Sequence, residues 1–218
     1  MTPSTFPDDA TRRRFLAGLG SAAATGLAGC SGRLPGTDPE RMDTETVVER
    51  DGNPQIRWEY PPRDDADGVG YAAVRTDRFV GEGARRSAVR LEFNSTVGRI
   101  AAADPYRGYR ADWFRFRVRP PTDYEDRLTY DLRVAPPQGG WEGLGAWYDV
   151  QGGARRTTVE LRDVGSQGTI LIPAVFDPPS AGLPDRLHCS FSVQASRPGA
   201  FGRTVRASGR GSLPLAER

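Results

Sequence analysis

Hydrophobic and polar residues alternate with a period of two along most of the chain beyond residue 45. Successive side chains of a β-strand point to opposite faces of its sheet, so this pattern predicts half-buried strands with one apolar and one polar face. No long segment beyond residue 30 shows the apolar spacing of an amphipathic helix. The alternating segments are Ile56–Tyr60, Val89–Phe93, Phe114–Val118, Leu128–Val134, Val159–Leu161 and Leu187–Val193.

Proline marks the expected strand ends. Pro-Pro pairs at 61–62, 120–121, 136–137 and 178–179 each follow an apolar run. Proline cannot donate to a strand ladder, so each pair should end a strand. The run Thr169–Phe176 is more continuously apolar, which is typical of a central strand, but Pro173 within it favours a sheet edge or a bulge.

Short strands with regular turn signals predict an all-β protein, an antiparallel β-sandwich of immunoglobulin-like or jelly-roll type. We place this single domain at residues 45–218. Residues 30–44 are polar and rich in turn-forming residues, which is typical of a tether. Residues 1–29 have a different character.

The N-terminal segment contains two short motifs in a fixed order. Thr11 is followed by Arg12, Arg13 and Arg14, and then by Phe15 and Leu16. A weakly apolar stretch rich in Ala and Gly continues to residue 28 and is too short to span a bilayer. It ends in Leu27, Ala28, Gly29 and Cys30.

This arrangement resembles the signal peptide of twin-arginine-exported lipoproteins, such as those of halophilic archaea. The resemblance covers residues 11–30 and assigns Arg12, Arg13, Phe15 and Leu16 to the export motif. It assigns Leu27, Ala28 and Gly29 to a lipobox, and Cys30 to the lipid-bearing position. It implies export of the folded protein and a lipid anchor at the outer face of the cytoplasmic membrane. A lipid holds a protein on a bilayer by about 0.8 kcal/mol per buried methylene.

All 30 basic residues are arginine, and 28 acidic residues leave a net charge of +2. Acidic residues are interleaved with the basic ones, which argues against a nucleic-acid partner. Arg115, Arg117 and Arg119 share one face of a predicted strand. We expect them to pair with Asp131, Glu160 or Asp149 across the sheet rather than to bind a separate anion.

One histidine and two cysteines exclude most metal sites, and we expect no metal and no cofactor. His188 and Cys189 are neighbours on a predicted strand and point to opposite faces, so they cannot act as base and nucleophile together. We expect a surface histidine and a small core residue, and assign no catalytic residue. A lipid on Cys30 would leave Cys189 without a partner; the alternative is a Cys30–Cys189 disulfide.

Trp141, Trp147 and Tyr148 lie in a glycine-rich segment with two interpretations. Large aromatic side chains are mostly buried, which favours a place in the core. Exposed and coplanar rings would instead offer a platform for sugars.

Separately, Asn94-Ser95-Thr96 matches the N-glycosylation acceptor and follows an apparent strand, where a turn would expose it.

The sequence therefore favours a non-catalytic, membrane-anchored module that binds a protein or glycan partner or supports the cell envelope. A carbohydrate-binding module that uses Trp141, Trp147 and Tyr148 is the alternative. A hydrolase, which would need His188 beside a Ser and an Asp in a cleft, comes third.

Overall fold

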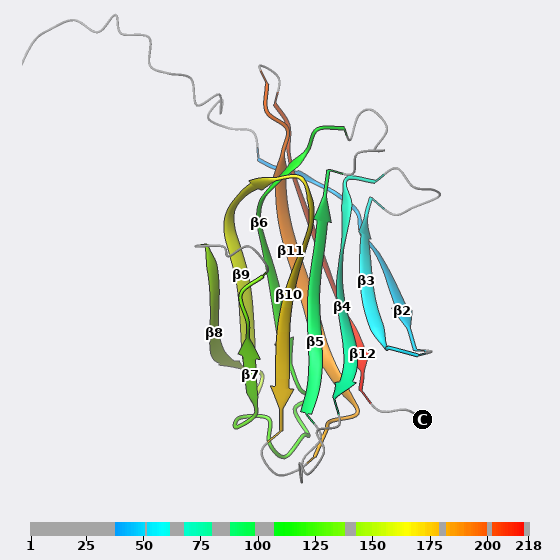
Figure 1. Ribbon diagram of the computed structural model, residues 1–218, viewed down its shortest axis with the longest axis vertical. Helices are drawn as coiled ribbons and strands as arrows, with labels where there is room; N and C mark the ends of the chain where they lie inside the picture. Colours follow the sequence, from blue (N-terminus) through cyan, green and yellow to red (C-terminus); the bar gives the residue numbers. More distant parts are fainter. Residues whose placement is uncertain are drawn as a thin grey trace, which may run out of the picture. The chain divides into compact units, whose positions relative to one another are not determined.

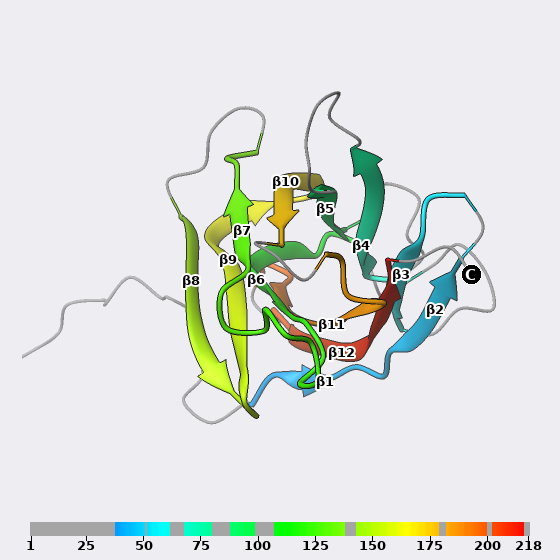
Figure 2. The ribbon, with the colours of Figure 1, turned by 90° about the horizontal axis from the view of Figure 1, so that it is seen from below.

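The computed structural model describes residues 38–50, 52–61, 68–79, 88–98, 107–137, 143–178, 182–199 and 202–215. These residues form two six-stranded sheets, which we call sheet A and sheet B (Figures 1 and 2). Sheet A has the order β1 (Glu40–Arg41), β12 (Thr204–Pro214), β11 (Arg186–Ser196), β6 (Arg110–Arg119), β9 (Ala154–Ser166), β8 (Leu144–Gln151). Sheet B has the order β2 (Glu45–Glu49), β3 (Gln55–Tyr60), β4 (Gly70–Phe79), β5 (Ala88–Val97), β10 (Gly168–Asp177), β7 (Asp131–Val134).

The predicted antiparallel β-sandwich is confirmed. Nine of the ten strand pairings among the described residues are antiparallel, and only β1 and β12 run parallel. The Pro-Pro pairs end strands as expected: β3, β6, β7 and β10 stop one or two residues before them. The described part of the chain contains no helix with the length and apolar character needed to cross a membrane.

Two strand predictions need correction. The strand expected from Leu128 begins only at Asp131, because residues 122–129 turn back on themselves and Tyr130 donates from its hydroxyl to the carbonyl oxygen of Arg155. Pro173 lies neither in an edge strand nor at a bulge, since β10 pairs with both β5 and β7. Because Pro173 has no N–H, it cannot donate a hydrogen bond to a neighbouring strand. No hydrogen bond of the ladder with β7 is lost, because that ladder stops at the neighbouring Ala174.

The folded body begins before residue 45. Glu40 and Arg41 pair with Val205 and Arg206 of β12, and the N–H of Met42 donates to the carbonyl oxygen of Arg206. The tether expected at residues 30–44 therefore overlaps the edge of sheet A at its C-terminal end. The rest of that segment, residues 30–37, and the whole of residues 1–29 lie outside the described residues.

The core lies between the inner faces of the two sheets and is rich in aromatic rings. Trp58 and Tyr60 of β3 pack on Phe191 of β11, with ring centroids 5.0 and 5.6 Å apart. Glycine makes this close approach of the sheets feasible. A Cβ atom at Gly209 would lie 2.3 Å from Cδ1 of Trp58, and one at Gly211 would lie 2.1 Å from Cδ1 of Ile56.

Candidate functional site

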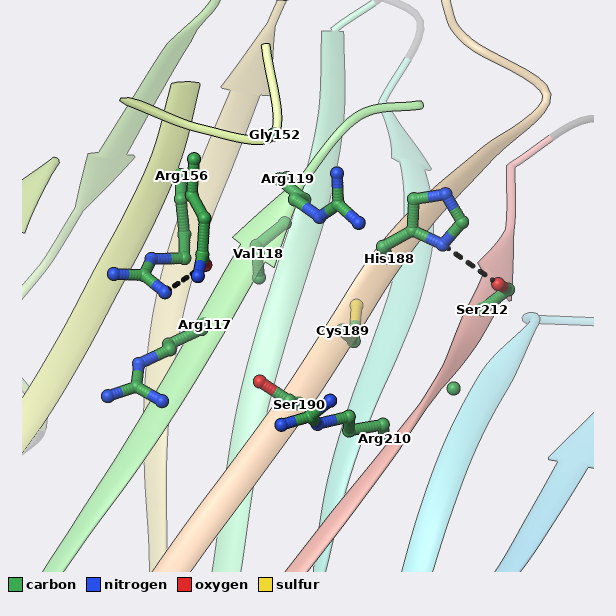
Figure 3. A pocket seen from close by; sticks show the side chains of 12 residues that line it. Arg117, Val118, Arg119, Gly152, Arg156, His188, Cys189, Ser190, Arg210 and Ser212 are labelled. Atoms are coloured by element: carbon green, nitrogen blue, oxygen red, sulfur yellow. Dashed lines mark hydrogen bonds between the residues drawn. The ribbon is translucent and has the colours of Figure 1, made fainter. Parts of the chain in front are cut away.

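The outer face of sheet A carries an open depression with a volume of about 620 Å³. Strands β6, β9, β11 and β12 supply its floor, and the hairpin turn between β8 and β9 closes one side (Figure 3). Its side chains point away from the core, because they alternate with buried residues such as Val118 and Cys189. The lining residues are Arg117, Val118, Arg119, Gln151, Gly152, Arg156, His188, Cys189, Ser190, Arg210, Gly211 and Ser212.

We call the four arginines of this depression, Arg117, Arg119, Arg156 and Arg210, the arginine face. They come from three strands, β6, β9 and β12, and are brought together by strand register. Arg117 of β6 lies opposite Ser190 of β11, and Ser190 lies opposite Arg210 of β12. No carboxylate lines the depression among the described residues. The site is therefore strongly cationic in a protein with almost no net charge.

The turn at Gly152 and Gly153 leaves space for this cluster. Both glycines have positive φ, 60° and 74°, as the central residues of a type I′ hairpin turn require. A Cβ at Gly152 would lie 3.7 Å from Nη1 of Arg119, so this guanidinium rests against the turn. The QGGA sequence thus fixes both the hairpin and one wall of the depression.

Some arginines on this sheet face have acidic partners. Arg115 and Arg162 both donate to Glu160, whose side chain is 4% exposed. Burial acts to raise the pKa of Glu160, but the two guanidinium groups outweigh it and hold that pKa below its usual value. Nε of Arg156 donates to Asp149 at 2.8 Å. The expected cross-strand pairing is thus confirmed for Arg115.

The expected pairing with Asp131, Glu160 or Asp149 is wrong for Arg117 and Arg119. Arg210 of β12 likewise has no acidic partner among the described residues. Within the described ranges, none of the three forms an ion pair. The physical reason is competition, because Glu160 and Asp149 are already taken by other arginines, and Asp131 lies on sheet B beside Arg133. These three arginines therefore have no ion-pair partner among the described residues.

The surroundings of Arg117 disfavour the charge on its side chain. Its Nε is buried and has no hydrogen-bond partner among the described residues. Burial lowers the pKa of its guanidinium, and Arg115 and Arg156 lower it further, against the opposite effect of Asp149 and Glu160. Arginine nevertheless stays protonated at neutral pH. Arg117 thus keeps a charged guanidinium whose Nε has no hydrogen-bond acceptor among the described residues.

His188 lies at one end of the depression. Its Nδ1 is 3.1 Å from Oγ of Ser212 (Figure 3). A Ser–His contact therefore exists, as a hydrolase would need, but Ser212 is the only described hydrogen-bond partner of the imidazole. Asp123 acts on His188 only through its charge. No carboxylate in the described residues orients the ring, which a Ser-His-Asp triad requires.

The pKa of His188 gives a prediction for this cluster. Burial lowers it from 6.5, and Arg119 and Arg186 lower it further, while Asp123 acts to raise it. Substituting Arg119→Gln should therefore raise the pKa of His188. NMR titration of the imidazole resonance measures this without overlap, since the chain has one histidine. Arg90→Gln, on the outer face of sheet B, is the control and should leave the pKa unchanged.

The same shift sets the direction of a pH effect on folding. A histidine with a lowered folded-state pKa binds protons less readily than it does in the unfolded chain. Its contribution to stability is present above pH 6.5 and is lost as the pH falls through the folded-state pKa.

In the NMR titration, an unchanged or lower pKa of His188 in the Arg119→Gln protein would contradict the arrangement described for this end of the depression.

Trp147 and Tyr148 are exposed rather than buried, which corrects the interpretation of this segment as core. They lie on β8 at the edge of sheet A, and their exposed fractions are 44% and 61%. Adjacent strand residues face opposite sides, so the two rings cannot form one coplanar platform. Trp147 lies on the outer face, in line with Thr158. The ring of Tyr148 is stacked by Arg155, whose Cζ is 3.7 Å from the ring centroid.

Other predicted residues are distributed as follows. Asn94 lies inside β5, opposite Ala73 and Leu171, and is half-buried, so the turn expected there is wrong. Cys189 is buried, and burial raises the pKa of its thiol to about 12. No group of potential metal ligands was found among the described residues. Outside these residues lie Arg12, Arg13, Phe15, Leu16, Leu27, Ala28, Gly29, Cys30 and Trp141.

The sequence drew attention to Arg117 and Arg119 but not to Arg156, Ser190, Arg210 or Ser212. These four residues come from three other strands. The only signal in the sequence is alternation, which places each on the polar face of its strand. Alternation does not predict which strands are neighbours in the sheet.

Comparisons with known proteins give no family. No protein-family model matches the chain, and no curated protein matches it in sequence. Among solved structures, the major pilin SpaD of Corynebacterium diphtheriae shares 12% identity over 73% of this chain and 47% of its own, with a TM-score of 0.35. The C-terminal domain of AspA of Streptococcus pyogenes has a TM-score of 0.33 at 9% identity, over 75% of this chain and 55% of its own. A collagen-binding domain of a Staphylococcus aureus adhesin has a TM-score of 0.29 at 8% identity, over 62% of this chain and 93% of its own. The chain thus spans about half the length of the first two proteins, and none of these likenesses assigns it a function.

Proposed function

We propose that this protein is an exported, lipid-anchored and non-catalytic module that binds an anionic ligand on the arginine face of sheet A. The observation that carries the proposal is the depression of about 620 Å³ in which Arg117, Arg119 and Arg210 form no ion pair with a described residue. A pocket of this size fits a ligand of several ring or chain units. Guanidinium groups bind carboxylate, sulfate and phosphate groups in a bidentate manner.

The arrangement of the site supports binding over catalysis. The depression is open, and its polar groups, apart from Gln151 and His188, are arginines and serines on regular strands. Hydroxyl and guanidinium groups at fixed strand spacing can hold an extended ligand without moving. The Ser212–His188 pair lacks a described orienting carboxylate, so a fluorophosphonate probe should leave Ser212 unlabelled. Labelling of Ser212 would favour the hydrolase alternative instead.

Binding is tested directly with a polyanion and its uncharged parent. Dextran sulfate should bind the purified protein in a titration calorimeter, and dextran of the same length should not. The affinity should fall steeply with salt, because each neutralised arginine contact releases counterions. Binding should also raise the melting temperature, since the ligand stabilises only the folded state. The proposal fails if dextran sulfate does not bind, or if dextran binds equally well.

The anchor has its own test. The lipobox resemblance puts the lipid on Cys30, so Cys30→Ser should move the protein from the membrane to the soluble fraction. Loss of the buried acyl chains, at about 0.8 kcal/mol per methylene, is large enough for complete release. Membrane fractionation followed by intact-mass measurement checks both location and lipid. Cys189→Ser is the control and should stay on the membrane. Equal membrane retention of the wild type and the Cys30→Ser protein would contradict lipidation.

A further inference from the structure

An exposed indole lies in line with the arginine face. The ring of Trp147 covers Gly145 on the outer face of β8: a Cβ at Gly145 would lie 3.3 Å from Cζ3 of the indole. One side of the ring therefore rests on the strand, and the side chain is 44% exposed. Glycine at position 145 is what allows the ring to lie there. The result is a flat apolar surface next to a cationic depression.

Strand register places this ring and two arginines in a single row. Trp147 lies opposite Thr158, Thr158 opposite Arg117, Arg117 opposite Ser190, and Ser190 opposite Arg210. Neighbouring strands are about 4.8 Å apart, so the row from Trp147 to Arg210 is about 19 Å long. The row crosses the five strands β8, β9, β6, β11 and β12. Thr158 of β9 is buried, so the groups that it offers to a ligand are the indole of Trp147, the guanidinium groups of Arg117 and Arg210, and the hydroxyl of Ser190.

The chemistry of the row matches a charged sugar chain better than other polyanions. Sugar rings present C–H faces that pack on an indole, and their hydroxyl groups exchange hydrogen bonds with serine. Their acidic groups suit Arg117 and Arg210. A polyphosphate has no ring to place on Trp147. Single-stranded nucleic acid would stack its bases on an aromatic side chain, but the proposed site at the cell surface makes it the less suitable ligand.

We propose that the anionic ligand is an acidic polysaccharide, with one sugar ring stacked on Trp147 and its acidic groups on Arg117 and Arg210. This inference rests on the proposed function and deepens it. The ligand then runs across the strands, from the edge strand β8 towards β12. It uses Trp147 of the three aromatic residues that the sequence singled out, and leaves Tyr148 on the opposite face.

The test compares probes that share charge but not rings. Oligogalacturonate of six units, with carboxylates, and dextran sulfate, with sulfates, are titrated beside inorganic polyphosphate and oligo-dT. Trp147→Ala should weaken oligogalacturonate or dextran sulfate binding at least 10-fold and leave polyphosphate binding within about twofold. Tyr148→Ala is the matched control, since it removes the neighbouring ring on the other face, and should leave all affinities unchanged. The sugar that binds the wild-type protein more tightly identifies the preferred acidic group.

Each contrary outcome has a distinct meaning. Equal loss of polyphosphate and sugar binding in Trp147→Ala, or no loss of either, overturns the stacked sugar but leaves the anion-binding proposal standing. Tighter, Trp147-dependent binding of oligo-dT overturns the polysaccharide in favour of nucleic acid. Failure of all four probes to bind the wild-type protein overturns the proposed function itself. Melting curves of each variant confirm that the fold is retained.

Discussion

Gly209→Val should destabilise the protein by about 3 kcal/mol or more, one of the two largest effects we expect. The first added atom would lie 2.3 Å from Cδ1 of Trp58 and 2.8 Å from its Nε1. Trp58 is fully buried and packs on Phe191, so its ring has nowhere to move. Overfilling a packed core commonly costs about 1–3 kcal/mol, and two branched methyl groups against a rigid ring belong at the upper end. For a domain of this size the melting temperature should fall by roughly 6–12 °C.

Calorimetry or chemical denaturation measures this effect, and the neighbouring residue supplies the control. Ser208 is exposed on the outer face of the same strand, so Ser208→Val should change the free energy of unfolding by less than about 0.5 kcal/mol. Trp58→Leu should lose less stability in the Gly209→Val background than in the wild type, because the smaller side chain makes room. Equal stability of the Gly209→Val and Ser208→Val proteins would show that the sheets do not approach each other at β12 and β3.

The second large effect concerns binding. Arg117→Glu combined with Arg210→Glu should weaken the binding of dextran sulfate at least 100-fold. Each substitution removes a charge-assisted contact of about 1.5–3 kcal/mol and adds repulsion. The slope of log affinity against log salt should also become smaller, by about one per lost contact. Titration at several salt concentrations measures both quantities.

The control for this variant keeps the same change of net charge. Arg90 and Arg133 lie on sheet B, with Arg90 exposed on its outer face and Arg133 paired with Asp131. Arg90→Glu combined with Arg133→Glu should weaken binding by less than about threefold. If both double variants lose the same affinity for dextran sulfate, the binding depends on the net charge of the protein and not on the arginine face. Near-wild-type melting curves show that the folds are intact.

Local pattern was enough to predict the fold class. The period of two in segments such as Val89–Phe93 and Leu187–Val193 is a property of single strands, and so is the stop signal of a Pro-Pro pair. It failed at Leu128, where the alternation continues into a turn. Here the backbone N–H groups of Thr129 and Tyr130 donate to the carbonyl oxygen of Asp126 instead of to a neighbouring strand. Apolar spacing does not distinguish these two cases.

The candidate site depends on which strands are neighbours, and that was beyond the sequence. Arg117 and Arg210 are brought to one row only because β11 lies between β6 and β12. The same holds for the acidic partners, since Glu160 lies opposite Arg115 rather than Arg117. The exposure of Trp147 follows from the place of β8 at the edge of sheet A. The sequence shows which residues are cationic, acidic or aromatic, but it does not show which of them lie next to each other in the sheet.

The most direct test follows the arginine side chains themselves. In the NMR spectrum of the purified protein, the Nε–H resonances of arginine are recorded during titration with oligogalacturonate and dextran sulfate. The resonances of Arg117, Arg119 and Arg210 should move with one common affinity, while those of Arg75 and Arg133 on sheet B should stay in place. Shifts centred on sheet B, or no shift at Arg117 and Arg210 at saturating ligand, would contradict the assignment of the outer face of sheet A as the binding surface.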